Sequence, residues 1–189
     1  MVISANPASG KTFLTMNLAM SLAIKKKRVV VVDLDMRKAA TSKYVRKPQV
    51  GISSYLNGQC ELKDIIHRYD GVELDVIPVG MIPPNPTELL YDERLAEAIE
   101  QLRKDYDYVF IDCPPVEVVA DSSIIAPFAD ISLFVVRAYL LERSMLPDVE
   151  MFYKSQRYPN MFMVLNGTES GSGYGYRKYG YRYGYRYGY

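Results

Sequence analysis

The chain has 189 residues, a length that suits one domain with a substantial hydrophobic core. With 49% hydrophobic and 24% charged residues, its composition is that of an ordinary globular protein, and its formal net charge is +1. Residues 174–189 contain four cations and no acid, so the rest of the chain carries −3. This acidic remainder lacks a general nucleic-acid signature, and we expect any such binding to be confined to the tail.

Cysteine and histidine are too scarce for several site classes. Cys60 and Cys113 are far apart, which argues against a disulfide framework and fits a reducing cytosol. His67 stands alone, which argues against a His-based triad or a zinc site. No run of about 18 apolar residues and no signal-peptide pattern is present, so we expect a cytoplasmic protein without a membrane span of its own.

A phosphate-binding loop is predicted near the start of the chain. Val2–Ser4 reads as a short strand, Ala5–Thr12 as the loop ANPASGKT, and Lys11–Ile24 as a helix. An ordinary strand–helix turn is the alternative. The helix has apolar residues at helical spacing: Leu14, Leu18, Ala19 and Leu22.

Such a loop binds phosphate through backbone N–H groups at a helix N-terminus. Lys11 would reach the β- and γ-phosphates of ATP, and the Thr12 hydroxyl would bind Mg²⁺. Related loops often have glycine where this chain has Ala8 and Ser9, which predicts a tighter cradle. The nucleotide contacts predicted in this region are Asn6, Ala8, Ser9, Gly10, Lys11, Thr12 and Phe13.

Two aspartates follow the next strand. Val29–Val32 is an uninterrupted apolar run, typical of a parallel strand buried on both faces. Asp33 and Asp35 therefore stand at its carboxyl end, where open α/β sheets bind ligands. One use for this pair is Mg²⁺ binding together with acceptance of a proton from an attacking hydroxyl. Alternatively, Asp33 only caps the following segment, and Arg37 either contacts phosphate or pairs with one of the aspartates.

A third aspartate, Asp112, ends the strand of the segment YVFIDCPP, Tyr108–Pro115, and matches the Mg²⁺-side aspartate of phosphate-loop enzymes. Asn166 follows the last predicted strand and either presents its amide to a purine or is a turn residue. Further strands are expected at Leu74–Val79, Ile131–Val136 and Met161–Leu165. Helices are expected from an Asn85 cap with Pro86 and a capping-box Glu88, and over Asp92–Tyr106.

Alternating strands and helices predict a P-loop NTPase-like α/β fold with a mostly parallel central sheet flanked by helices. We expect one domain over residues 1–168 and a flexible tail over 169–189. The tail carries eight tyrosines separated by glycine and cations: Tyr174, Tyr176, Tyr179, Tyr181, Tyr183, Tyr185, Tyr187 and Tyr189. Such tails also occur as condensate-forming or RNA-binding segments. With a nucleotide site in the same chain, the tyrosines become candidate phosphoacceptors.

These segments together resemble the bacterial tyrosine kinases of capsule and exopolysaccharide synthesis. The resemblance rests on VVDLDMRK, on GMIPPNPTELL at Gly80–Leu90, on DYVFIDCPP and on the tyrosine cluster. It implies ATP-dependent autophosphorylation of the tail, with Lys11, Asp33, Asp35 and Asp112 as catalytic residues. Mg²⁺ would bind Thr12, Asp35 and Asp112, and Arg37 and Asn166 would contact the nucleotide, Asn166 at the adenine.

The resemblance also implies partners. These are a transmembrane polysaccharide co-polymerase that activates the kinase at the inner face of the membrane, a ring of identical subunits and a phosphotyrosine phosphatase. Members of the family have a helix before the first strand, whereas Met1 stands almost at that strand, so the chain is either a fragment or assembles differently. Two other functions compete: a partitioning or cell-division ATPase of the same superfamily, although Asn6 replaces its signature lysine, and a catalytically inactive scaffold.

Overall fold

The computed structural model describes residues 1–45, 49–69, 71–116 and 121–168. The strands in these ranges form one sheet in the order β3-β4-β2-β5-β1-β6-β7. Neighbouring strands are parallel except β3 and β4, which form an antiparallel edge that the sequence did not predict. The strands are β1 Val2–Ser4, β2 Val29–Asp33, β3 His67–Arg68, β4 Leu74–Ile77, β5 Tyr108–Asp112, β6 Ser132–Arg137 and β7 Met161–Asn166.

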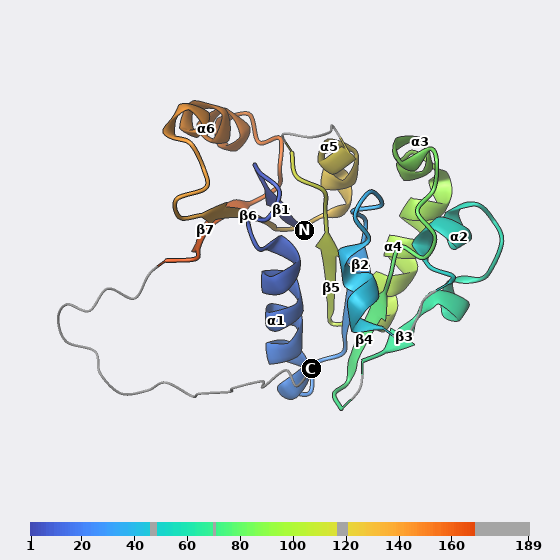
Figure 1. Ribbon diagram of the computed structural model, residues 1–189. Coiled ribbons are helices and arrows are strands. Elements are labelled where there is room, and N and C mark those ends of the chain that lie inside the picture. Colours follow the sequence, from blue (N-terminus) through green and yellow to red (C-terminus); the bar gives the residue numbers. More distant parts are fainter. Residues whose placement is uncertain (46–48, 70, 117–120, 169–189) are drawn as a thin grey trace, which may run out of the picture.

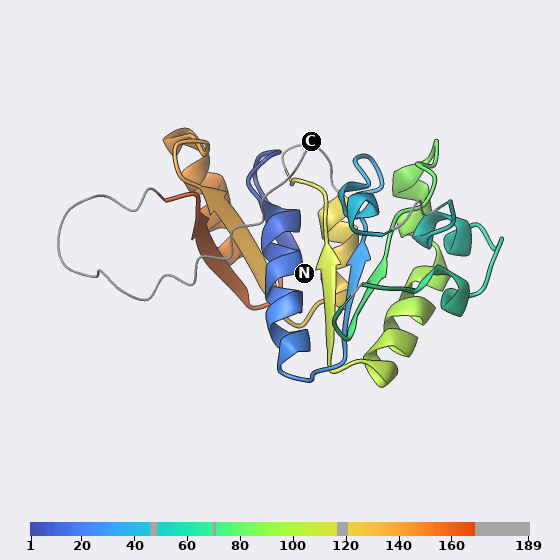
Figure 2. The same cartoon turned by 60° about the horizontal axis from the view of Figure 1, so that its bottom comes forward.

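Helices cover both faces of the sheet. They are α1 Lys11–Ile24, α2 Ile52–Leu56, α3 Pro86–Leu90, α4 Glu93–Asp105, α5 Asp121–Ile125 and α6 Leu146–Lys154. In Figures 1 and 2, α1 lies over the middle of the sheet, with β6 and β7 to one side and β5, β2 and β4 to the other. No helix within the described ranges has the length and apolar character needed to cross a membrane.

Strand β2 shows why the sheet is buried on both faces. Its five residues are all buried, as the apolar run predicted. Val29 and Val31 belong to the hydrophobic cluster under α1, whereas Val30 and Val32 belong to the larger cluster on the opposite face. Side chains that alternate along the strand thus belong to two cores. The α/β fold predicted from the sequence, with a mostly parallel central sheet flanked by helices, is confirmed.

Helix α1 has the predicted bounds, but of its four predicted apolar positions only Ala19 is fully buried. The fully buried positions include Thr15, Met16, Ala19 and Ala23, while Leu14, Leu18 and Leu22 are only half-buried. Small side chains against the sheet let the helix backbone approach closely, so the leucines lie at the flanks of the contact. Helical spacing alone does not distinguish these two faces.

The predicted capping box before α3 is wrong. Pro86 does occupy the first turn, but the Asn85 side chain accepts no hydrogen bond from a helix N–H group. Instead, its amide donates to the Glu88 carboxylate at 2.8 Å. Helix α4 is capped by Asp92, whose carboxylate accepts from the Arg94 N–H. Strand β4 also ends at Ile77, two residues before the predicted end.

Candidate nucleotide and phosphotransfer site

The predicted site residues from three separate segments meet at one edge of the sheet. Strands β1, β2 and β5 are neighbours or near neighbours and run parallel, so their carboxyl ends lie together. Asp33 and Asp112 are register partners on β2 and β5. The loop 5–10 leaves β1 at the same edge and leads into α1. The fold therefore brings the phosphate loop and both aspartate segments together.

Side chains from elsewhere in the chain hold the carbonyl groups of the loop. The Arg137 guanidinium donates to the Ala8 carbonyl at 2.8 Å, and the Asn166 amide donates to the Ser9 carbonyl at 2.9 Å. Because C=O and N–H of a trans peptide point in opposite directions, these bonds turn the Ser9 and Gly10 N–H groups away from those partners. The loop is thereby set to offer N–H donors to an anion.

Backbone conformation at Ala8 and Gly10 shapes the loop. Both residues have a positive φ, 61° at Ala8 and 93° at Gly10. Glycine adopts this region freely, whereas alanine pays about 1–2 kcal/mol for it. A Cβ atom at Gly10 would also lie 2.2 Å from the Asn166 side-chain nitrogen. Gly10 is thus required for packing as well as for conformation.

Thr12 and Asp112 provide oxygen ligands of the kind that Mg²⁺ prefers. The Thr12 hydroxyl donates a short hydrogen bond to Oδ2 of Asp112, as a metal-side pair in a phosphate-loop enzyme would be arranged. The other oxygen, Oδ1, is buried and has no hydrogen-bond partner within the described ranges. Lys11 is only 7% exposed and has no ion-pair partner among the described residues. An unpartnered buried carboxylate oxygen and an unpaired buried cation fit a bound metal and phosphate.

Burial dominates the electrostatics of the two register partners. It raises the pKa of Asp112 to about 7, with a further rise from the Asp33 charge, while the Thr12 hydrogen bond and Lys11 act in the opposite direction. Burial likewise raises the pKa of Asp33, against the lowering effect of its hydrogen bonds to Thr41. Two buried carboxylates side by side thus disfavour the ionised state unless a cation joins them.

The three aspartates differ in what surrounds them. The Asp33 carboxylate is fully buried and accepts bonds from the Asp35 N–H and from the Thr41 N–H and hydroxyl at 2.8–3.0 Å. This geometry favours the capping role for Asp33 that the sequence left open. Asp35 is 5% exposed, and its carboxylate makes no hydrogen bond or ion pair in the described part of the chain. Asp35 is therefore the better placed of the two for chemistry.

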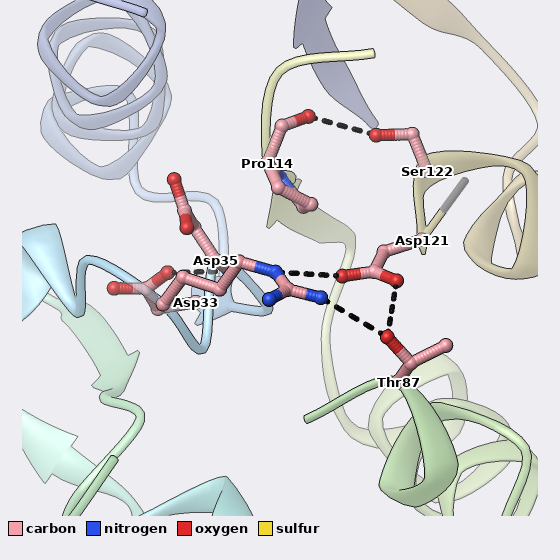
Figure 3. A network of polar contacts seen from close by, with 7 residues as sticks. Asp33, Asp35, Thr87, Pro114, Asp121 and Ser122 are labelled. Atoms are coloured by element: carbon pink, nitrogen blue, oxygen red, sulfur yellow. Dashed lines mark hydrogen bonds and ion pairs between the residues drawn. The ribbon is translucent and has the colours of Figure 1, made fainter. Parts of the chain in front are cut away.

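Arg37 does not pair with Asp33 or Asp35. Its Nε lies 3.4 Å from the Asp121 carboxylate, and its Nη2 donates to the Thr87 hydroxyl at 3.1 Å. Thr87 in turn donates to the other Asp121 oxygen at 2.8 Å, as Figure 3 shows. Thr87 lies in the PPNPTELL segment and Asp121 starts α5. Neither carries a motif of known chemistry, so the sequence alone did not single them out.

The other predicted contacts are Asn6, Phe13 and Asn166. Asn6 donates to the Met145 sulfur at 3.6 Å, and Phe13 is 62% exposed on α1. Asn166 contacts the loop backbone, a contact that its predicted role at the adenine did not include. Arg137 and Thr41 also support the site, and only the folded chain reveals them. The tail tyrosines lie outside the described residues.

Comparison with known proteins identifies the family. The family model described as an AAA domain, AAA_31, matches residues 2–138. The tyrosine-protein kinase wzc of Salmonella typhimurium is 38% identical over 138 residues, which cover 72% of this chain and 19% of the relative. The tyrosine-protein kinase etk of Escherichia coli K12 is 35% identical over 138 residues, with the same coverage. The chain thus spans about a fifth of these relatives.

Solved structures agree with this relationship. The kinase domain of Escherichia coli tyrosine kinase ETK has a TM-score of 0.82 at 30% identity, covering 94% of this chain and 72% of that one. The BceF tyrosine kinase domain has a TM-score of 0.78 at 36% identity, covering 88% and 68%. The septum site-determining protein MinD of Pyrococcus horikoshii has a TM-score of 0.71 at 24% identity, covering 89% of this chain and 72% of that one, and shows the fold alone. The chain therefore belongs to the family of bacterial tyrosine-protein kinases and corresponds to their P-loop kinase domain.

Proposed function

We propose that the chain is an ATP-dependent tyrosine kinase domain whose acceptors are the tyrosines of its own residues 174–189. The observation that carries this proposal is the buried Asp112 oxygen, which has no partner among the described residues and lies next to the Thr12 hydroxyl at the edge where the phosphate loop ends. A structural aspartate would use both oxygens within the protein. The free oxygen supports a ligand that the nucleotide brings with it.

The residues present fit Mg²⁺. Thr12, Asp112 and Asp35 would hold it, through hydroxyl and carboxylate oxygens. No group of three or more His, Cys, Asp or Glu side chains in the described ranges forms a metal cage, so phosphate and water oxygens would complete the ligand set. When bound, Mg²⁺ neutralises negative charge on the phosphates.

The remaining chemistry belongs to side chains and backbone. The N–H groups of Ser9 and Gly10 and the Lys11 ammonium bind the phosphates and stabilise the charge that develops on them. The γ-phosphoryl group passes from ATP to a phenol oxygen, and ADP leaves. Tyrosine has a pKa near 10, so a base must take the phenol proton. Asp35 has a buried carboxylate without a hydrogen bond or ion pair among the described residues, and it can take the proton on the oxygen that does not bind the metal. Positioning, rather than covalent catalysis, supplies most of the rate enhancement.

The composition of the tail suits it as a substrate. Its tyrosines are separated by glycine and cations, so it has no apolar face to bury. Each phosphate adds about −1.5 to −2 charges, so two or three phosphates reverse the +4 of residues 174–189. Repulsion from the acidic remainder of the chain would then favour release of the tail from a subunit ring.

The wider setting follows from the family. We infer a role in regulating capsule or exopolysaccharide synthesis and export, at the inner face of the cell membrane. The inferred partners are a transmembrane co-polymerase that activates the kinase, further copies of the chain in a ring, and a phosphatase that resets the tail. The matched segment covers only 19% of these relatives, so they carry long further segments, and an activating domain among those segments is part of this proposal.

Intact mass spectrometry after incubation with Mg²⁺-ATP tests the catalytic proposal. We expect the chain to gain mass in steps of one phosphate, with several steps on one molecule. Lys11→Met and deletion of residues 174–189 should each abolish the gain, because one removes the phosphate contact and the other the acceptors. Lys154→Met, which breaks an exposed ion pair with Glu150 on α6, is the matched control and should behave like the parent chain.

The same experiment separates the competing functions. ATP hydrolysis without mass gain, even with the cytoplasmic segment of a co-polymerase added, would indicate an ATPase switch. The absence of both ATP hydrolysis and nucleotide binding would indicate an inactive scaffold. Mass gain that persists after deletion of residues 174–189 would place the acceptors elsewhere in the chain.

A further inference from the structure

The Asp121 carboxylate holds Arg37 at the rim of the site. Asp121 is buried and uses both oxygens, one toward the Arg37 Nε at 3.4 Å and one toward the Thr87 hydroxyl at 2.8 Å. Arg37 also donates to Thr87 at 3.1 Å, which closes a three-membered network. A buried carboxylate needs such partners, because removing a charge from water is costly.

Three separate elements fix this network in place. Arg37 follows β2, Thr87 belongs to α3, and Asp121 opens α5. The next residue, Ser122, donates to the Pro114 carbonyl at 2.8 Å, which ties α5 to the segment just after Asp112 (Figure 3). The position of Arg37 is thus coupled to both aspartate segments of the site.

The network separates two opposite charges that are close in sequence. Arg37 is two residues from Asp35, yet its side chain points to Asp121, and within the described residues Asp35 has no cationic partner. An arginine pairs readily with a carboxylate within reach, and Asp35 is 5% exposed, so screening by water would be weak. Asp121 supplies the competing anion.

We propose that Asp121 is a positioning residue that keeps Arg37 away from Asp35. This inference rests on the proposed function, in which Asp35 is a Mg²⁺ ligand. With Arg37 held by Asp121, the Asp35 carboxylate stays open to the metal. It also fixes the Arg37 guanidinium at the rim, where its remaining N–H groups can meet phosphate oxygens. Loss of Asp121 frees Arg37 to form an ion pair with Asp35, and that pair competes with Mg²⁺.

Equilibrium binding of a fluorescent, non-hydrolysable ATP analogue, titrated with Mg²⁺, tests this role without requiring turnover. Asp121→Asn should raise the half-saturating Mg²⁺ concentration roughly three- to tenfold, the range expected for a competing ion pair. Asp107→Asn is the matched control. It breaks the 2.8 Å Arg28–Asp107 pair at the opposite end of the strands and should leave the midpoint unchanged. Thermal unfolding confirms that both variants are folded.

A double variant decides whether Asp121 acts through Arg37. In Asp121→Asn/Arg37→Gln the competing cation is gone, so the Mg²⁺ midpoint should return to that of Arg37→Gln alone. A double variant as impaired as Asp121→Asn would overturn the proposal and leave Asp121 a purely structural role. An unchanged midpoint in Asp121→Asn would overturn it as well. Failure of the parent chain to transfer phosphate would instead count against the proposed function, because this assay measures binding only.

Discussion

At the scale of single residues, Asp112 illustrates a conflict between stability and function. Its carboxylate is fully buried, and one oxygen has no partner in the described part of the chain. Burial raises its pKa to about 7 from the usual 3.8. The folded state therefore binds a proton more tightly than the unfolded state, and this group lowers the free energy of unfolding as the pH rises between these two values.

Asp112→Asn should therefore stabilise the metal-free protein at pH 8, because the amide is neutral at every pH. We expect a gain of about 1–2 kcal/mol, or a melting temperature higher by about 2–8 °C, together with loss of phosphate transfer. Thermal unfolding of both proteins in EDTA, at pH 8 and at pH 5, measures the change in stability. At pH 5 the parent carboxyl is already largely protonated, so the gain should shrink. Equal gains at both pH values would refute the electrostatic explanation.

At the scale of elements, the loop between β1 and α1 depends on a strand far away in the sequence. Asn166 ends β7 and donates to the Ser9 carbonyl, and its side chain occupies the space where a Cβ at Gly10 would lie. The phosphate loop is therefore shaped by β7 as well as by its own residues.

Gly10→Ala should cost about 2–3 kcal/mol and weaken nucleotide binding. The positive φ contributes about 1–2 kcal/mol, and displacement of Asn166 from its hydrogen bond adds about 1 kcal/mol. Gly71→Ala is a matched control, because Gly71 has φ 89° but open space around its missing Cβ. It should show the conformational cost only. Chemical denaturation and titration with the ATP analogue provide the two measurements.

Asn166→Ala tests the origin of the difference. Measured against Asn166→Ala alone, adding Gly10→Ala should cost about as much as Gly71→Ala, because no Asn166 side chain or hydrogen bond remains to be displaced. If Gly10→Ala costs no more than Gly71→Ala when Asn166 is present, the contact between loop and β7 does not constrain Gly10.

At the scale of the whole molecule, two hydrophobic clusters on opposite faces of the sheet account for the folded body. Among the residues that the structure describes, their members lie between Met1 and Met161. The tail lacks the apolar spacing expected of a segment that would extend either cluster. Its contribution is expected in phosphate transfer and charge, since its removal changes the formal net charge from +1 to −3.

Deletion of residues 174–189 should accordingly shift the melting temperature by less than about 1 °C and leave affinity for the ATP analogue unchanged. Differential scanning fluorimetry and the analogue titration measure both quantities on the same preparations. A drop of several degrees would mean that the tail packs on the body, contrary to the boundary expected after residue 168.

Much of the fold and part of the site could be predicted from local patterns. The apolar run at Val29–Val32 specified a strand buried on both faces, and the loop before Lys11 specified a helix start. The positions of Asp33 and Asp112 at the ends of apolar runs predicted that each lies at the carboxyl end of a strand, and the structure makes them register partners. These features depend on neighbours in sequence, which is why they could be read without the structure.

The sequence by itself determined the class of fold, the phosphate loop and the family. Only the tertiary structure decided three contacts. Asp33 accepts hydrogen bonds from Thr41, and Arg37 pairs with Asp121. Asn166 donates to the Ser9 carbonyl in the phosphate loop. Each of these contacts joins side chains whose separation in space is set by packing of the sheet and its helices. A carboxylate beside an arginine in sequence can pair with it or with a distant partner, and burial in the folded chain selects between the two.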